Sequence, residues 1–165
     1  MSKRIRQYIG LLAGIIAYYI VHEGAHFLYS LCLGVFKQIN FMGLGVQVDV
    51  YSERMTQTQL GIFCLLGPVA TIIFAYILVA FIDKIGRLPS KIAKACSYYI
   101  TMAMLMIDPL YLSLLCRLFG GGDMNGIALL FPEEWFRIVC AILLVINISV
   151  FVKIVVPKYK LVFGD

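Results

Sequence analysis

The chain has 165 residues, of which 62% are hydrophobic and only 14% are charged. A soluble domain is nearer half apolar and a quarter charged, so this composition excludes an ordinary soluble protein and predicts a polytopic membrane protein. The formal net charge of +5 comes from basic residues grouped at the ends of apolar stretches, where membrane topology explains them. It therefore does not indicate a nucleic-acid partner.

Four apolar segments are long enough to cross a lipid bilayer, and they cover residues 8–34, 60–82, 95–119 and 135–156. After the first of them, residues 39–50 alternate partly between apolar and polar and contain two glycines, which predicts one or two short strands. The expected fold class is an all-α polytopic membrane protein with about four transmembrane helices. A short membrane-associated β-hairpin segment follows the first helix.

Basic residues are unevenly distributed among the segments outside these helices. The N-terminus, the loop at residues 83–94 and the C-terminus are basic, whereas residues 36–59 and 117–134 carry charges of both signs. The positive-inside rule then places both termini of this multi-pass protein in the cytoplasm. The strand segment and the glycine-rich stretch at 120–126 are expected on the opposite side, near the C-terminal half of the first helix.

The first apolar segment contains the run His22-Glu23-Gly24-Ala25-His26. Helix positions i and i+4 lie on one face, one turn apart, which is the arrangement of two zinc ligands with a neighbouring glutamate placed as a base. Ionisable groups inside a membrane helix are costly and usually mark a functional site that faces the bundle interior. Two structural histidines beside a buried glutamate are the competing interpretation, which the cost of burying such groups disfavours.

A catalytic zinc site normally has three protein ligands and one open position for water. The chain has only two histidines, His22 and His26, so the third ligand must be another residue type. Depth in the membrane favours Asp108, which can alternatively be a carboxylate paired within the bundle, and backbone freedom favours Asp123 in the glycine-rich stretch. Glu23 need not ligate, so it can accept a proton from water and later donate it to a leaving amine.

In their order along the chain, these elements resemble the site-2 protease family of intramembrane zinc metalloproteases, in a minimal form without soluble accessory domains. Residues 22–27, HEGAHF, resemble the family's HExxH in its first core helix. Residues 39–50 are similar to the strands that follow that helix. Residues 67–71, GPVAT, resemble the Gly-Pro element of the second core helix, and residues 122–126, GDMNG, stand where the family places its Asp-Gly motif.

The resemblance implies that residues 1–165 form a single integral-membrane metalloprotease domain. It implies that His22, His26 and Asp123 bind Zn2+ and that Glu23 is the catalytic base. The implied activity is that of a zinc metalloendopeptidase, which hydrolyses peptide bonds in or near the transmembrane segments of membrane-spanning or membrane-tethered substrates in the lipid bilayer. The sequence carries no indication of an oligomeric state.

The chain departs from the family pattern at two places. Thr71 stands where the family often has Asn, and residues 118–122 replace the usual Asn-x-x-Pro approach to Leu-Asp-Gly. Asn125 is then the candidate oxyanion donor, with a turn-forming residue as the alternative. Residues 39–50 are expected either to hold an extended substrate by edge pairing or simply to seal the site.

The alternative function is that of a non-catalytic membrane protein, a metal-binding or scaffold protein such as a degenerate protease or a transporter-like chain. Glu23 favours the enzyme, because a protein that only binds metal has no need of a carboxylate directly after the first histidine.

Overall fold

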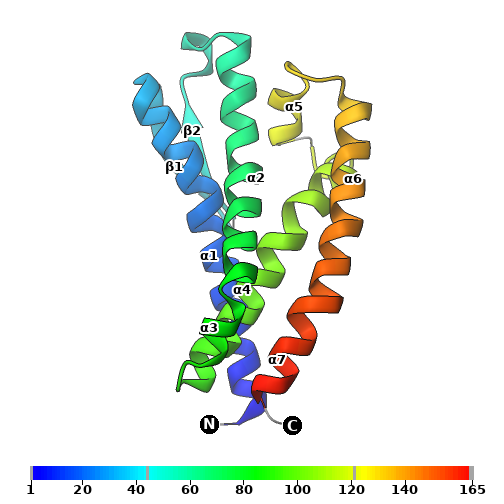
Figure 1. Ribbon diagram of the computed structural model, residues 1–165. Helices are drawn as coiled ribbons and strands as arrows, with labels where there is room; N and C mark the ends of the chain where they lie inside the picture. Colours follow the sequence, from blue (N-terminus) through cyan, green and yellow to red (C-terminus); the bar gives the residue numbers. More distant parts are fainter. Residues whose placement is uncertain (1, 44, 121, 164–165) are drawn as a thin grey trace.

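A computed structural model describes residues 2–43, 45–120 and 122–163 of the chain. The fold is mostly helical, with a two-stranded hairpin after the first helix (Figure 1). In chain order the elements are α1 (Lys3–Leu33), β1 (Phe36–Met42), β2 (Gly45–Val50), the 3-10 turn η1 (Ser52–Arg54), α2 (Gln57–Ala80), α3 (Ile82–Gly86), α4 (Lys91–Leu110), the π-helical turn η2 (Tyr111–Leu115), α5 (Asp123–Ile127), α6 (Glu133–Val150), the π-helical turn η3 (Phe151–Val155) and α7 (Val156–Phe163).

Four helical rods within the described residues are long and apolar enough to cross a membrane: α1, α2, α4 with η2, and α6 continued through η3 and α7. The predicted fold class is therefore confirmed. The ends of the rods differ from the predicted ones. The first rod begins earlier, because Ser2 caps α1 by accepting the Ile5 N–H at 3.4 Å. The third ends at Leu115, ahead of the glycine run, and the fourth continues to Phe163 through its π-helical turn.

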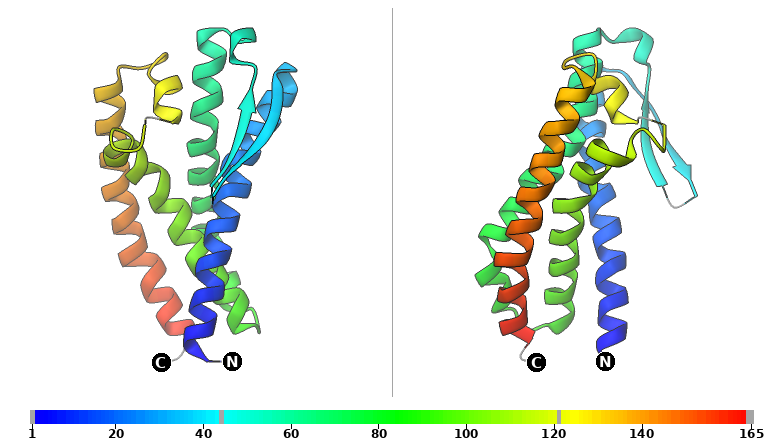
Figure 2. Two further views of the ribbon diagram at one scale, coloured as in Figure 1. Left: turned by 180° about the vertical axis from the view of Figure 1, so that it is seen from behind. Right: turned by 90° about the vertical axis from the view of Figure 1, so that its right-hand side faces the viewer.

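Different elements lie at the two ends of the bundle (Figures 1 and 2). The start of α1, the short helix α3 and the end of α7 gather at one end, whereas the hairpin and α5 lie toward the other. The strand segment and the start of α5 therefore approach the C-terminal half of α1, as the charge pattern predicted. The cytoplasmic side of the termini stays a prediction.

Helix α1 turns a stripe of small and polar residues toward the bundle at intervals of about four residues. Its buried members are Gly10, Gly14, His22, His26 and Ser30. A Cβ atom added to Gly10 would lie 2.4 Å from the Tyr99 ring, and one added to Gly14 would lie 2.9 Å from the Tyr99 carbonyl oxygen. The two glycines thus let α1 and α4 pack at close range, as small residues do in membrane helix pairs.

The hairpin lies beside the C-terminal half of α1 (Figure 2). Gly34 ends α1 in the left-handed conformation, with φ of 67°, and this turn directs the chain back along the helix. The strands β1 and β2 are antiparallel, with Ile39 opposite Val48 and Asn40 opposite Gln47. The strands predicted within residues 39–50 are confirmed, although the first one begins earlier, at Phe36.

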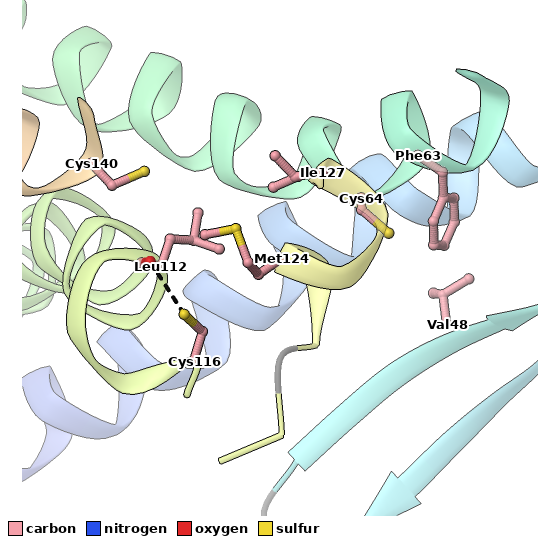
Figure 3. Packing of buried hydrophobic residues seen from close by; sticks show 8 residues of the cluster. All are labelled: Val48, Phe63, Cys64, Leu112, Cys116, Met124, Ile127 and Cys140. Atoms are coloured by element: carbon pink, nitrogen blue, oxygen red, sulfur yellow. Dashed lines mark hydrogen bonds between the residues drawn. The ribbon is translucent and has the colours of Figure 1, made fainter. Parts of the chain in front are cut away.

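A cluster of buried apolar side chains joins β2, α2, η2, α5 and α6 (Figure 3). Its members are Val48, Phe63, Cys64, Leu112, Cys116, Met124, Ile127 and Cys140. Met124 and Ile127 anchor the short helix α5 in this cluster, and a Cβ atom on Gly126 would lie 2.3 Å from the Cys64 sulfur. Helix α5 therefore packs directly on α2, and this contact fixes the position of Asp123 in its first turn.

Candidate metal centre

His22 and His26 lie one turn apart on the buried stripe of α1, as their spacing predicted. Their Nε2 atoms are 3.2 Å apart, and both side chains are almost completely buried. Glu23 is half-buried beside them, and one potential ligand atom from each of the three residues lies within 4.8 Å of the others. This His–Glu–His group could hold a metal ion.

Helix α5 brings Asp123 to the same two nitrogen atoms. Its Oδ2 lies 3.0 Å from the Nε2 of His22, and its Oδ1 lies 3.6 Å from the Nε2 of His26. Burial opposes ionisation of Asp123, but its hydrogen bonds with the two histidines outweigh burial and lower the pKa of this carboxyl group to about 2. Asp123 is therefore an anionic oxygen donor that faces both imidazole rings.

Asp108 meets the other nitrogen of His22. The Nδ1 of His22 lies 3.2 Å from Asp108 Oδ1 and 3.3 Å from Oδ2, so an N–H at this position donates to the carboxylate. Tyr18 donates to Oδ1 at 2.6 Å, and the Thr71 hydroxyl donates to Oδ2. A carboxylate that accepts from one ring nitrogen of a histidine orients the ring and leaves the other nitrogen free for a metal. Asp108 therefore lies where it can orient the His22 ring. The Tyr18 and Thr71 hydroxyl groups in turn hold the Asp108 carboxylate.

Depth and backbone freedom left the choice between Asp108 and Asp123 open, and the family resemblance then implied Asp123. The sequence interpretation did not include Tyr18. A signal for Tyr18 was present, because it lies four residues before His22 on the same helix face. Thr71, noted only as a departure from the family pattern, lies where its hydroxyl reaches Asp108.

The distance between the two histidine Nε2 atoms fits ligands of a single metal ion. Two nitrogen ligands of one zinc ion lie about 3.3 Å apart when each Zn–N distance is about 2.0–2.1 Å, and the two Nε2 atoms here are 3.2 Å apart. Gly67 keeps the space beside them open, since an added Cβ atom would lie 2.5 Å from the Nε2 of His26 and 2.7 Å from that of His22. Two imidazoles with one carboxylate are also a donor set of catalytic zinc sites.

Glu23 is attached to the hairpin. Its Oε2 accepts the backbone N–H of Val48 at 2.8 Å. This N–H therefore points away from β1 and toward α1, which makes β2 the strand whose free edge faces the histidines. An open cavity of about 540 Å³ lies between them, and it is lined by both histidines, Glu23, Asp123 and residues 45–48 of β2.

Asn125 does not join this group of donors in the part of the chain that the structure describes. It is exposed in α5, and its backbone N–H donates to the Gly122 carbonyl oxygen at 3.2 Å. That contact belongs to the turn role that the sequence interpretation gave as the alternative. The oxyanion role of Asn125 stays a prediction.

The two aspartates are expected to respond differently to substitution. Asp108→Asn keeps the shape of the side chain but removes the charge that orients His22, so we expect metal affinity to fall about 10–100-fold. Asp123→Ala removes a donor atom and should leave less metal bound than Asp108→Asn. Zinc content and a competitive chelator titration of both purified variants measure this. An empty site in Asp108→Asn with a full site in Asp123→Ala would reverse the two assignments.

No protein-family model, curated protein or solved structure matches this chain. What the fold and the site define together is a mostly helical protein with four candidate membrane-spanning helices and a possible metal centre between them.

Proposed function

We propose that this protein is an intramembrane zinc metalloendopeptidase of the site-2 protease type, formed by residues 1–165 as one integral-membrane domain with both termini in the cytoplasm. The observation that carries the proposal is the convergence of His22, His26 and Asp123 on one point, with Glu23 next to them. His22, Glu23 and His26 lie on α1, whereas Asp123 lies on α5. His22 and Asp123 are in contact although they are 101 residues apart in sequence.

In this proposal His22, His26 and Asp123 hold the zinc ion. When bound, zinc supplies a Lewis acid that makes water nucleophilic near neutral pH and polarises the scissile carbonyl group. Asp108 keeps the Nδ1 side of His22 occupied, so that Nε2 faces Asp123 and His26. The small residue Gly67 leaves the coordination space free.

Glu23 serves as the general base and then as the general acid. In this proposal its carboxylate, directly after His22 in the chain, lies beside the metal ligands and does not itself bind the metal. The Val48 N–H holds one carboxylate oxygen at 2.8 Å, which leaves the other oxygen available to take a proton from water and pass it to the leaving amine. This division of roles is why a carboxylate is needed at position 23.

The free edge of β2 favours a peptide as the substrate. A helical substrate hides its carbonyl groups, so it must become extended before it is cut. Because N–H groups alternate in direction along a strand, Val46 presents its backbone on the same edge as Val48, toward the cavity. An extended segment of a membrane-spanning or membrane-tethered protein can pair with this edge through main-chain hydrogen bonds.

Removal of the metal tests the proposal. The protein is reconstituted into vesicles together with the membrane proteins of a host cell. New N-termini in those proteins are then identified by mass spectrometry. We expect cleavage products in or next to transmembrane segments, their loss after treatment with a chelator, and their return with added zinc. His22→Ala is the matched control. A protein that binds zinc stoichiometrically but yields the same N-termini as His22→Ala is the non-catalytic metal-binding or scaffold protein of the alternative.

A further inference from the structure

A proline interrupts the backbone hydrogen bonds of α4 directly after Asp108. Pro109 has no N–H, so it cannot donate to the carbonyl oxygen of Leu105, four residues earlier, and its ring crowds that carbonyl group. The helix then continues as the π-helical turn η2. Residues 105–109 thus form a proline turn, which contains the carboxylate that contacts His22.

Asn147 of α6 supplies the donor that the proline turn lacks. Its Nδ2 donates to the Leu105 carbonyl oxygen at 2.7 Å, and its Oδ1 accepts the hydroxyl hydrogen of Tyr76, on α2, at 2.8 Å. Asn147 and Leu105 are completely buried. A buried carbonyl group that is left unpaired is costly, so this contact is a specific one. Asn147 thus joins α6 to both α4 and α2, and α4 lies between the other two helices (Figure 1).

The proline turn is not closely packed on all sides. An apolar cavity of about 190 Å³ lies between α2, α4 and α6, and it is lined by Asp108, Pro109 and Leu143, among others. Leu143 precedes Asn147 by one turn of α6, so the cavity adjoins the hydrogen bond to Leu105. Close packing holds groups in place in a protein interior, but a cavity provides no such contacts. The hydrogen bond from Asn147 is therefore a fixed point for the proline turn beside this cavity.

Asp108 moves with the same turn. Its Oδ1 lies 3.2 Å from the Nδ1 of His22, and the Nε2 of that ring faces Asp123 at 3.0 Å. A carboxylate in this position orients the ring of a metal-binding histidine, so a displaced Asp108 would turn or release the ring. The position of the proline turn therefore sets the orientation of His22.

We propose that Asn147 is a positioning residue for the metal centre. It holds the Leu105 carbonyl group and thereby fixes the proline turn, and the proline turn places Asp108 against His22. Asn147 does not line the cavity at the histidines, so it acts only through α4. The proposal rests on the metal centre of the proposed function, but it does not require peptide cleavage.

The zinc affinity of the purified full chain tests this role, measured by competition with a chromogenic chelator. Asn147→Leu replaces the amide by an apolar side chain of similar size, and we expect it to lower the affinity about tenfold. Asn147→Leu/Asp108→Asn should bind zinc no more weakly than Asp108→Asn alone, because Asn147 acts through the Asp108 carboxylate. The absorption spectrum of the cobalt-substituted protein reports the geometry of the metal ligands and should also change in Asn147→Leu.

Two controls separate positioning from a general loss of stability. Tyr76→Phe removes one hydrogen bond of Asn147 and keeps the other, to Leu105, so it should bind zinc as the wild type does. Thr101→Val removes a buried hydroxyl group of α4 that donates within its own helix, to the Ser97 carbonyl oxygen at 2.8 Å. It should lower thermal stability without changing the zinc affinity.

A second background covers the case in which Asn147→Leu does not fold. In Pro109→Ala, the new N–H at position 109 can pair with the Leu105 carbonyl group, so the amide of Asn147 is no longer needed there. Adding Asn147→Leu should then change the zinc affinity of Pro109→Ala less than about twofold.

Three results would overturn the role of Asn147. They are wild-type affinity in Asn147→Leu, an equal loss in Thr101→Val, and a further loss of about tenfold when Asn147→Leu is added to Asp108→Asn or to Pro109→Ala. A wild-type protein without bound zinc would overturn the metal centre together with this role. Zinc binding without peptide cleavage would overturn the peptidase alone.

Discussion

Replacing Glu23 by glutamine is expected to abolish peptide cleavage while leaving the metal bound. Glutamine has the size of glutamate and can still accept the Val48 N–H, so the contact between α1 and β2 is kept. It cannot take a proton from water at neutral pH. Loss of a general acid–base group typically costs about 10²–10⁴-fold in rate, and we expect a decrease in this range.

The rate is measured with a substrate identified by the N-terminal analysis, in vesicles that contain equal amounts of each variant. Zinc content is determined on the same preparations. Glu53→Gln is the matched control, because Glu53 is exposed in the turn after the hairpin. This variant should cleave the substrate at the wild-type rate. Equal rates for Glu23→Gln and the wild type would rule out Glu23 as the base.

Gly67→Ala is expected to empty the metal centre although it adds only one methyl group. That methyl group would lie 2.5 Å and 2.7 Å from the two histidine Nε2 atoms, in the space that the ion needs. Either α2 moves away or the coordination fails. We expect zinc affinity to fall by at least the 10–100-fold seen when residues that support a metal site are lost.

Gly24→Ala is the matched control for this prediction. Gly24 lies on α1 between the two histidines, but an added Cβ atom there meets nothing within 4 Å. Alanine also favours the helix over glycine by about 1 kcal/mol, so this variant should fold and bind zinc as the wild type does. Competition with a chromogenic chelator measures both affinities. Wild-type affinity in Gly67→Ala would mean that the ion is held elsewhere.

Features that depend on near neighbours in the chain could be predicted from the sequence. Runs of apolar residues about the length of a bilayer crossing predicted the four helices, because a helix satisfies the backbone hydrogen bonds of such a segment within the segment itself. The i, i+4 spacing of His22 and His26 placed both rings on one face, because the helical repeat requires it. The alternation in residues 39–50 predicted the strands, although β1 begins before the pattern, at Phe36.

The roles of Asp108 and Asp123 depend on contacts between distant segments. Asp108 meets His22 across 86 residues and Asp123 meets it across 101, so no local pattern tells which nitrogen each one faces. The packing of α4 on α1 puts Asp108 at Nδ1, and the docking of α5 on α2 puts Asp123 at Nε2. The same packing brings Gly67 against the rings. Helix periodicity orients a side chain, but only the assembled bundle selects the atoms that it meets.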